Sequence, residues 1–180
     1  MARGRPNPRV LEGNGCARAL GFCALIAAAL ACGDDGGGES GPEPSFPAGY
    51  AVSYSEVRGC RNSGDHELNR IRVLVDANAL GPYRDRGADF PVGSVVLKEE
   101  HGFADADCTE APVRWTVMTR LAAGSSPQTL DWYWQDVDAT RRVTSENDSR
   151  CVGCHTGCGV PPEGYLGTCT VVGASDGAFP

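Results

Sequence analysis

Four runs of alternating apolar and polar residues lie in the middle of the chain, and each predicts a half-buried strand. They are residues 69–76, 93–100, 112–121 and 130–137. In the second run Leu97 and Glu99 share one face, and Lys98 lies on the other. Short polar loops join the runs, which favours antiparallel pairing. We therefore expect a mainly β, α+β fold with an antiparallel sheet of about four to five strands and short helices.

Helical structure is considered at three further places. Residues 50–60 fit a short helix or an extended lead-in equally well, and residues 77–86 fit a helical or turn connection. A brief C-terminal helix is expected to lead into and carry a cysteine motif that begins at residue 151. Its candidate cap residues are Thr144 and Ser145, with Asn147 and Asp148 three residues on.

The first 31 residues have the pattern of an export signal. A leader with four arginines precedes Ala19–Ala31, an apolar run that ends in small residues. This run is too short to span a membrane as a helix. We therefore expect residues 1–31 to be a removed signal peptide.

The end of that run, Ala29-Leu30-Ala31-Cys32-Gly33, resembles the lipobox of bacterial lipoproteins, in which the cysteine is acylated and becomes the new N-terminus. Lipidation is therefore expected at Cys32. Glycine rather than aspartate follows Cys32, so we expect an outer-membrane lipoprotein facing the periplasm; plain secretion is the alternative. Residues 33–49 are rich in Gly, Pro, Ser and acidic residues, so residues 32–49 are expected to be the lipid anchor and a flexible linker. The folded domain would then be residues 50–180.

The charge of the processed chain excludes one class of partner. Residues 1–31 hold four arginines and one glutamate, so their removal takes the net charge from −7 to −10. A domain this acidic is not expected to bind nucleic acid. A basic partner would have to be a small cationic protein or substrate.

The sequence Cys151-Val152-Gly153-Cys154-His155 is the C-x-x-C-H attachment signature of c-type haem. Two thiols three residues apart on a helical turn can reach the two vinyl groups of one porphyrin, and the histidine then binds the iron. Export would bring the chain to the compartment where bacteria attach such haems. We therefore predict one covalent haem c, bound by Cys151 and Cys154 with His155 as the axial iron ligand.

Two other interpretations of these cysteines are open. Cys151, Cys154, His155 and Cys158 have a spacing that could bind zinc, although an oxidising compartment disfavours free thiolates. Alternatively, the segment is a disulfide-bonded loop in a structural lipoprotein without haem.

The remaining cysteines of the folded part suit two disulfides. Of nine cysteines, Cys16 and Cys23 would leave with the signal peptide, and six remain beyond Cys32. If two of these six hold haem, proximity suggests the pairs Cys60–Cys108 and Cys158–Cys169. Four cysteines allow three connectivities, and the sequence does not choose among them.

The stretch from Arg70 to His155 resembles the cytochrome P-460 domain. The resemblance runs in order through RVLVDANAL, FPVGSVVLKEE, TVMTRL, DWYWQD and CVGCH, and it covers about half of the chain. It implies a mostly antiparallel β fold with short helices, usually in a homodimer. The chain departs from the family after His155, where it continues TGCGVPPEGYLGTCT.

The resemblance also implies a role for Lys98, the single lysine of the chain. In the members that gave the family its name, the lysine at this position forms an additional covalent bond to a meso carbon of the haem. Relatives without the bond bind nitric oxide at an open iron. The alternative is that Lys98 is an ordinary surface residue of an alternating strand.

The distal side of the iron is expected to be open. Only three side chains beyond the signal could supply a sixth ligand. Met118 is expected to pack in the core, and His66 and His101 lie next to charged loops and are expected to be solvated. A five-coordinate iron could take a small ligand such as nitric oxide or hydroxylamine.

Oxidation of hydroxylamine also requires a carboxylate that accepts protons. The candidates are Asp136, Asp138, Glu146 and Asp148. Three functions are therefore considered. The first is hydroxylamine oxidation or nitric oxide handling, with electrons passed to a soluble redox protein. The second is non-enzymatic electron transfer or nitric oxide binding, and the third is a haem-free structural role.

Overall fold

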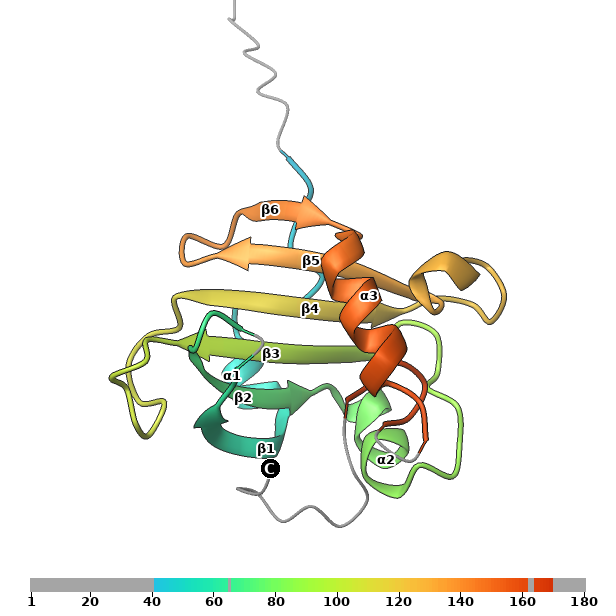
Figure 1. The fold of residues 1–180 in the computed structure, drawn as a ribbon, viewed down its shortest axis with the longest axis horizontal. Coiled ribbons are helices and arrows are strands. Elements are labelled where there is room, and N and C mark those ends of the chain that lie inside the picture. The colour runs from blue at the N-terminus through green and yellow to red at the C-terminus, as the bar shows by residue number, and fades with distance from the viewer. Residues whose placement is uncertain (1–40, 65, 162–163, 170–180) are drawn as a thin grey trace, which may run out of the picture. The chain divides into compact units, whose positions relative to one another are not determined.

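A six-stranded antiparallel sheet forms the centre of the structure, a computed structural model that describes residues 41–64, 66–161 and 164–169. Consecutive strands are hydrogen-bonded neighbours throughout, in the order β1-β2-β3-β4-β5-β6 (Figure 1). In chain order the elements are α1 (Tyr50–Ser53), β1 (Ser55–Asn62), β2 (Arg70–Val75), α2 (Ala77–Asp85), β3 (Val95–His101), β4 (Arg114–Arg120), the 3-10 helix η1 (Pro127–Thr129), β5 (Trp132–Asp138), β6 (Val143–Glu146) and α3 (Ser149–Cys158).

The expected mainly β, α+β fold is confirmed, and the sheet has one strand more than the upper expectation. The four predicted strands are β2, β3, β4 and β5. The predicted signal peptide and Cys32 lie outside the described residues. Within the described ranges, no helix is both long and apolar enough to cross a membrane.

Side chains alternate between two buried faces of the sheet. The α3 face is covered by α2 and α3, and Figure 1 shows α3 crossing the sheet in front of the central strands. The buried core of this face is Val73, Val75, Ala79, Tyr83, Phe90, Val96, Met118, Trp132 and Trp134. The opposite α1 face has a core of Phe46, Tyr50, Leu74, Val95, Leu97, Trp115, Val117 and Val137. Both faces bury large aromatic side chains, which contribute much of the hydrophobic stabilisation of a core.

Two segments differ from the sequence-based expectation in their secondary structure. Residues 50–60 contain both alternatives, because the short helix α1 is followed by strand β1. The helix expected to begin at Thr144 or Ser145 was placed too early. These residues belong to β6, and α3 begins only at Ser149, with Asp148 as its N-cap.

The folded part also begins before residue 50. Phe46 is buried in the α1 face with 3% of its surface exposed. The backbone N–H of Ser45 donates to Oε1 of Gln135 at 2.7 Å, and Arg141 donates to the carbonyl of Phe46 at 2.8 Å. The predicted flexible linker up to residue 49 was therefore too long, because these contacts hold its last residues on the sheet.

Strand β3 carries two adjacent buried carboxylates on opposite faces. On the α1 face, Glu99 accepts hydrogen bonds from Arg72 and from the hydroxyl of Tyr50, the latter at 2.5 Å. Burial raises the pKa of Glu99, but the hydrogen bonds from Arg72 and Tyr50 outweigh it, and the net pKa is lowered. Glu99 is therefore buried as a carboxylate rather than as a neutral acid.

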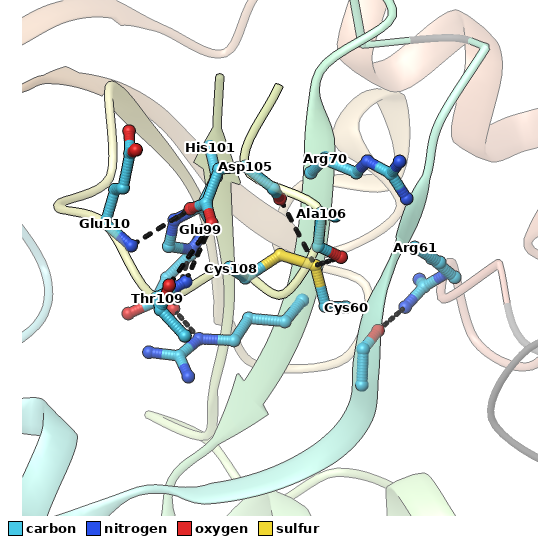
Figure 2. The surroundings of a disulfide bond; sticks show 12 residues. Cys60, Arg61, Arg70, Glu99, His101, Asp105, Ala106, Cys108, Thr109 and Glu110 are labelled. Carbon is cyan, nitrogen blue, oxygen red and sulfur yellow. Dashed lines mark hydrogen bonds and ion pairs between the residues drawn. A yellow bond between two sulfur atoms is a disulfide. The ribbon is translucent and has the colours of Figure 1, made fainter. Parts of the chain in front are cut away.

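His101 belongs to the same buried network. Its side chain has no exposed surface, so the expectation that it is solvated was wrong. Its Nε2 lies 3.3 Å from Glu99 and its Nδ1 lies 3.1 Å from Asp105. Figure 2 shows these residues beside the disulfide Cys60–Cys108, which ties β1 to the loop after β3. This pair is one of the two disulfides that proximity suggested.

On the α3 face, Glu100 has no exposed side-chain surface and is surrounded by donors. Arg114 donates to its Oε2 at 2.7 Å, and Asn69 donates to the same oxygen at 3.3 Å. Nδ1 of His66 lies 3.1 Å from Oε1. Burial raises the pKa of Glu100, but His66 and Arg114 outweigh it and lower the pKa to about 2.

Glu100→Gln is expected to lower the free energy of unfolding at pH 7 by about 3 kcal/mol, the equivalent of the pKa shift from 4.5 to about 2. Because the folded-state pKa is depressed, this stabilisation is present above pH 4.5 and is lost as the pH falls towards 2. Urea unfolding of both proteins across this range measures the difference. Glu110→Gln, at an exposed position, is the control and should change stability by less than about 0.5 kcal/mol. An equal effect of the two substitutions would contradict the role of Glu100.

Candidate functional site

Helix α3 places the cysteine motif against the α3 face of the sheet. The carboxylate of Asp148 caps the helix by accepting from the backbone N–H of Arg150 at 2.7 Å. Cys151 and Val152 pack against the core of this face, whereas Cys154 is exposed. Because residues three and four apart are neighbours on a helix, Cys154 and His155 both lie beside Cys151 on α3.

Among the described cysteines, Cys151 and Cys154 are the two outside disulfides. Cys158 is bonded to Cys169, the second pair that proximity suggested. Burial, followed by the charges of Asp136 and Asp148, raises the pKa of Cys151 to about 11. The zinc interpretation loses support because Cys158 is held in a disulfide and is not available as a thiolate.

One nitrogen of His155 is engaged by the backbone. Nδ1 lies 2.6 Å from the carbonyl oxygen of Gly167, so it carries the proton and donates it to that oxygen. The imidazole also packs edge-on against Trp134, with 4.7 Å between the ring centroids. Burial, followed by the positive charge of Lys98, lowers the pKa of His155 to about 4. At neutral pH the ring is uncharged, and Nε2 is the nitrogen that can bind a metal.

Lys98 lies on the face of β3 that is covered by the helix with the motif. Its cross-strand partners are Val73 in β2 and Thr116 in β4, and it points to the same face of the sheet as Val96. Its positive charge acts on both Cys151 and His155. The structure thus brings Lys98 and the C-x-x-C-H motif to the same face of the sheet, although more than 50 residues separate them in the sequence.

His66 lies between Lys98 and Glu100. Its Nε2 is 2.6 Å from Nζ of Lys98, and its Nδ1 faces Glu100. A proton on Nδ1 leaves Nε2 as the acceptor for the amine of Lys98. The side chain is only 21% exposed, and each of its ring nitrogens has a polar partner. The expectation of a solvated His66 was therefore wrong. The partner that holds it in place is the buried Glu100.

The four candidate carboxylates have different surroundings. Asp136 is 7% exposed, accepts a hydrogen bond from Ser145 at 2.7 Å and lies across the sheet from Thr116, the residue opposite Lys98. Asp148 is occupied as the cap of α3, and Glu146 is exposed on the edge strand β6. Asp138 accepts from Thr140 and Arg142 within its own turn. Asp136 is therefore the candidate that faces the motif from the sheet.

Met118 lies in the core of the α3 face with 6% of its surface exposed, as expected of a packing residue. Three contributors to the site were not identified from the sequence: the carbonyl of Gly167, the ring of Trp134 and the carboxylate of Glu100. Only the last had a local signal, because Glu100 lies two residues after Lys98 in the K-E-E run.

The residues present fit a covalently bound haem. Two cysteines outside disulfides and a neutral, oriented imidazole lie on one helix, and that is the donor set that c-type attachment uses. A metal-binding histidine usually donates from its other ring nitrogen to a carbonyl or carboxylate, as Nδ1 of His155 does to Gly167.

Comparison with known proteins identifies the family. No curated protein matches the chain. The family model of cytochrome P460 matches residues 47–159, which is more than half of the sequence and contains Lys98 as well as the C-x-x-C-H motif. The chain therefore belongs to the cytochrome P460 family of haem proteins.

Proposed function

We propose that this cytochrome carries one haem attached to Cys151 and Cys154 and ligated by His155, and that it oxidises a small nitrogenous substrate such as hydroxylamine. The observation that carries the proposal is the convergence of two charged side chains on the motif. Lys98 acts electrostatically on His155 and Cys151, and Asp136 acts on Cys151. Beside a haem attached to this motif, the cation could hold the cofactor and the carboxylate could accept protons.

Each residue has a defined role in this proposal. When bound, the haem supplies the site where the substrate nitrogen binds and loses electrons. Asp136 accepts the protons that the substrate releases, with its carboxylate oriented by Ser145. Lys98, held by His66, is the residue that joins the haem edge. His155 binds the iron through Nε2.

One observation favours a second candidate, non-enzymatic binding of nitric oxide. Nζ of Lys98 is already hydrogen-bonded to His66, and His66 is itself hydrogen-bonded to the buried Glu100. If these hydrogen bonds persist beside the haem, Lys98 forms no covalent bond to the porphyrin. The iron then serves as a ligand-binding or electron-carrying centre. The state of Lys98 in the loaded protein therefore separates the two candidates.

The cellular setting proposed for this activity follows from the sequence. A lipid on Cys32 would tether the protein to the outer membrane, facing the periplasm. Electrons would leave to a soluble redox protein, and the net charge of −10 after processing favours a basic surface on that acceptor. Dimerisation, usual for the family, remains a prediction.

Expression in a host that matures c-type haem should give a protein whose haem survives denaturation. The gel band should stain for haem, and the intact mass should include one haem. Cys151→Ala/Cys154→Ala should lose the stain, because both thioether bonds are gone. Cys60→Ala/Cys108→Ala, which removes the disulfide at β1, should retain it. Wild-type protein without retained haem would contradict the proposal.

Lys98→Arg tests the additional bond to the haem. The optical spectrum of the ferrous wild-type protein should show a strongly red-shifted Soret band, because a bond to the porphyrin edge changes its electronic structure. The variant keeps the positive charge but has no amine to form the bond, so it should have an ordinary c-type spectrum. Identical ordinary spectra for the two proteins would favour the nitric oxide binder.

Asp136→Asn should lower the rate of hydroxylamine oxidation at least 10²-fold, because a positioned proton acceptor typically contributes that much. Binding of nitric oxide to the ferrous protein requires no proton acceptor and should be unchanged. Glu146→Gln, on the exposed edge strand, is the matched control and should oxidise hydroxylamine at the wild-type rate. The reverse pattern would assign the role to Glu146.

A further inference from the structure

We propose that the Cys158–Cys169 disulfide is a positioning device for the axial ligand: it holds the carbonyl of Gly167 on Nδ1 of His155 and thereby lowers the reduction potential of the haem. The inference rests on the proposed function, because it takes His155 as the iron ligand. It concerns the segment after His155, where the chain departs from the family pattern and where the family match ends at residue 159.

The disulfide and the accepting carbonyl meet at the same ring nitrogen. The bond joins the last residue of α3 to Cys169, eleven residues on. Gly167 lies two residues before Cys169, and its carbonyl oxygen is 2.6 Å from Nδ1 of His155. Sγ of Cys169 itself is 3.5 Å from the same nitrogen. The covalent closure of this loop therefore takes place directly beside the hydrogen bond to His155.

The described part of this loop has little regular structure of its own. Its strand-like pairing is limited to an isolated bridge between Tyr165 and Thr168, beside single backbone hydrogen bonds from Gly164 to Val160 and from Gly167 to Gly159. Gly167 belongs to no strand or helix, so its position depends on the covalent closure of the loop, on its hydrogen bond to Gly159 and on side-chain contacts. A covalent tie removes much of the conformational freedom of such a segment.

Close backbone packing fixes the other side of the loop. The N–H of Gly167 donates to the carbonyl of Gly159 at 2.9 Å, and a Cβ built on Gly159 would lie 2.5 Å from the Cα of Gly167. Gly167 has a φ of +87°, which favours glycine. Trp132 donates from Nε1 to the carbonyl of Leu166 at 2.7 Å. The carbonyl of Gly167 is thus fixed between α3 and β5.

The orientation of this carbonyl has a chemical consequence for the iron ligand. A hydrogen bond from Nδ1–H fixes the tautomer of the imidazole and makes its other nitrogen a stronger electron donor. A stronger donor stabilises ferric over ferrous iron, so the reduction potential falls. If the loop were released, the hydrogen bond would weaken and the potential would rise.

The test compares two disulfides of the matured, haem-loaded protein. Cys158→Ser/Cys169→Ser removes the proposed positioning device. Cys60→Ser/Cys108→Ser removes the disulfide that ties β1 to the loop after β3, shown in Figure 2. The midpoint potential is measured for both variants and for the wild type. Resonance Raman spectra of the ferrous proteins give the iron–histidine stretching frequency, which reports on the donor strength of the ligand.

The first variant should shift the ferric–ferrous equilibrium at least tenfold towards ferrous iron, which is a rise of about 59 mV for one electron. Its iron–histidine frequency should fall. The second variant should change the equilibrium less than twofold and leave the frequency unchanged. Equal shifts in both variants, or a shift in neither, would overturn the inference while leaving the haem assignment intact.

Gly167→Ala provides a test that keeps both disulfides. The added Cβ would lie 3.0 Å from Nε1 of Trp132 and would occupy a positive-φ position, so the carbonyl must move. This variant should raise the reduction potential and lower the iron–histidine frequency, as the first variant should. It provides the test of the inference if the Cys158→Ser/Cys169→Ser protein does not accumulate. An unchanged potential in Gly167→Ala would overturn the inference. Wild-type protein that binds no haem would overturn the proposed function, and this inference with it.

Discussion

The alternation of side chains along β3 is the constraint on which the rest of the site depends. The strand lies inside the sheet, paired with β2 and β4, and six of its seven residues are buried. Lys98 is the half-exposed member. A shift of one residue in register would send Lys98 to the α1 face and Glu99 to the face of α3. The hydrophobic residues on both faces oppose such a shift, because it would exchange all their positions at once.

This constraint allows buried charges to sit on both sides of one strand. On the α1 face Glu99 is compensated by Arg72, and on the α3 face Glu100 is compensated by Arg114 and His66. Removing one partner of such a pair is costly, because an unpaired charge stays buried. The network on the α3 face extends through His66 to Lys98 and therefore couples the stability of the sheet to the position of the lysine proposed to bond to the haem.

The surroundings of His155 after α3 are built from residues that are close in sequence. His155, the disulfide Cys158–Cys169 and the carbonyl of Gly167 all lie within fifteen residues. The opposite side is built from β3, β5 and the loop at His66. Helix α3 thus packs on the sheet through Cys151 and Val152 and is tied at its last residue to a disulfide-closed loop. Rigid support of this kind would keep a metal ligand in one geometry.

The central strands could be predicted from the sequence because their alternation is regular, and the motif could be found because its spacing is local. Strand β1 was harder to identify, since two register shifts, between Glu56 and Arg58 and between Arg58 and Arg61, break its alternation. Strand β6 has four residues, and its hydroxyl side chains suggested a helix cap.

The surroundings of His66 could not be derived locally. Its acceptor Glu100 lies 34 residues away, and only the pairing of β2 with β3 brings the two together. The buried state of His101 likewise depends on its contacts with Glu99 and Asp105, and the sequence alone does not show that these three side chains are buried together.

The crystal structure of the haem-loaded protein is the most direct test of this account. It should show the haem on the α3 face, with thioether bonds to Cys151 and Cys154, Nε2 of His155 on the iron and Nδ1 on the carbonyl of Gly167. Lys98 should lie at the porphyrin edge. A haem bound on the α1 face, or an iron ligated by a residue other than His155, would contradict the account.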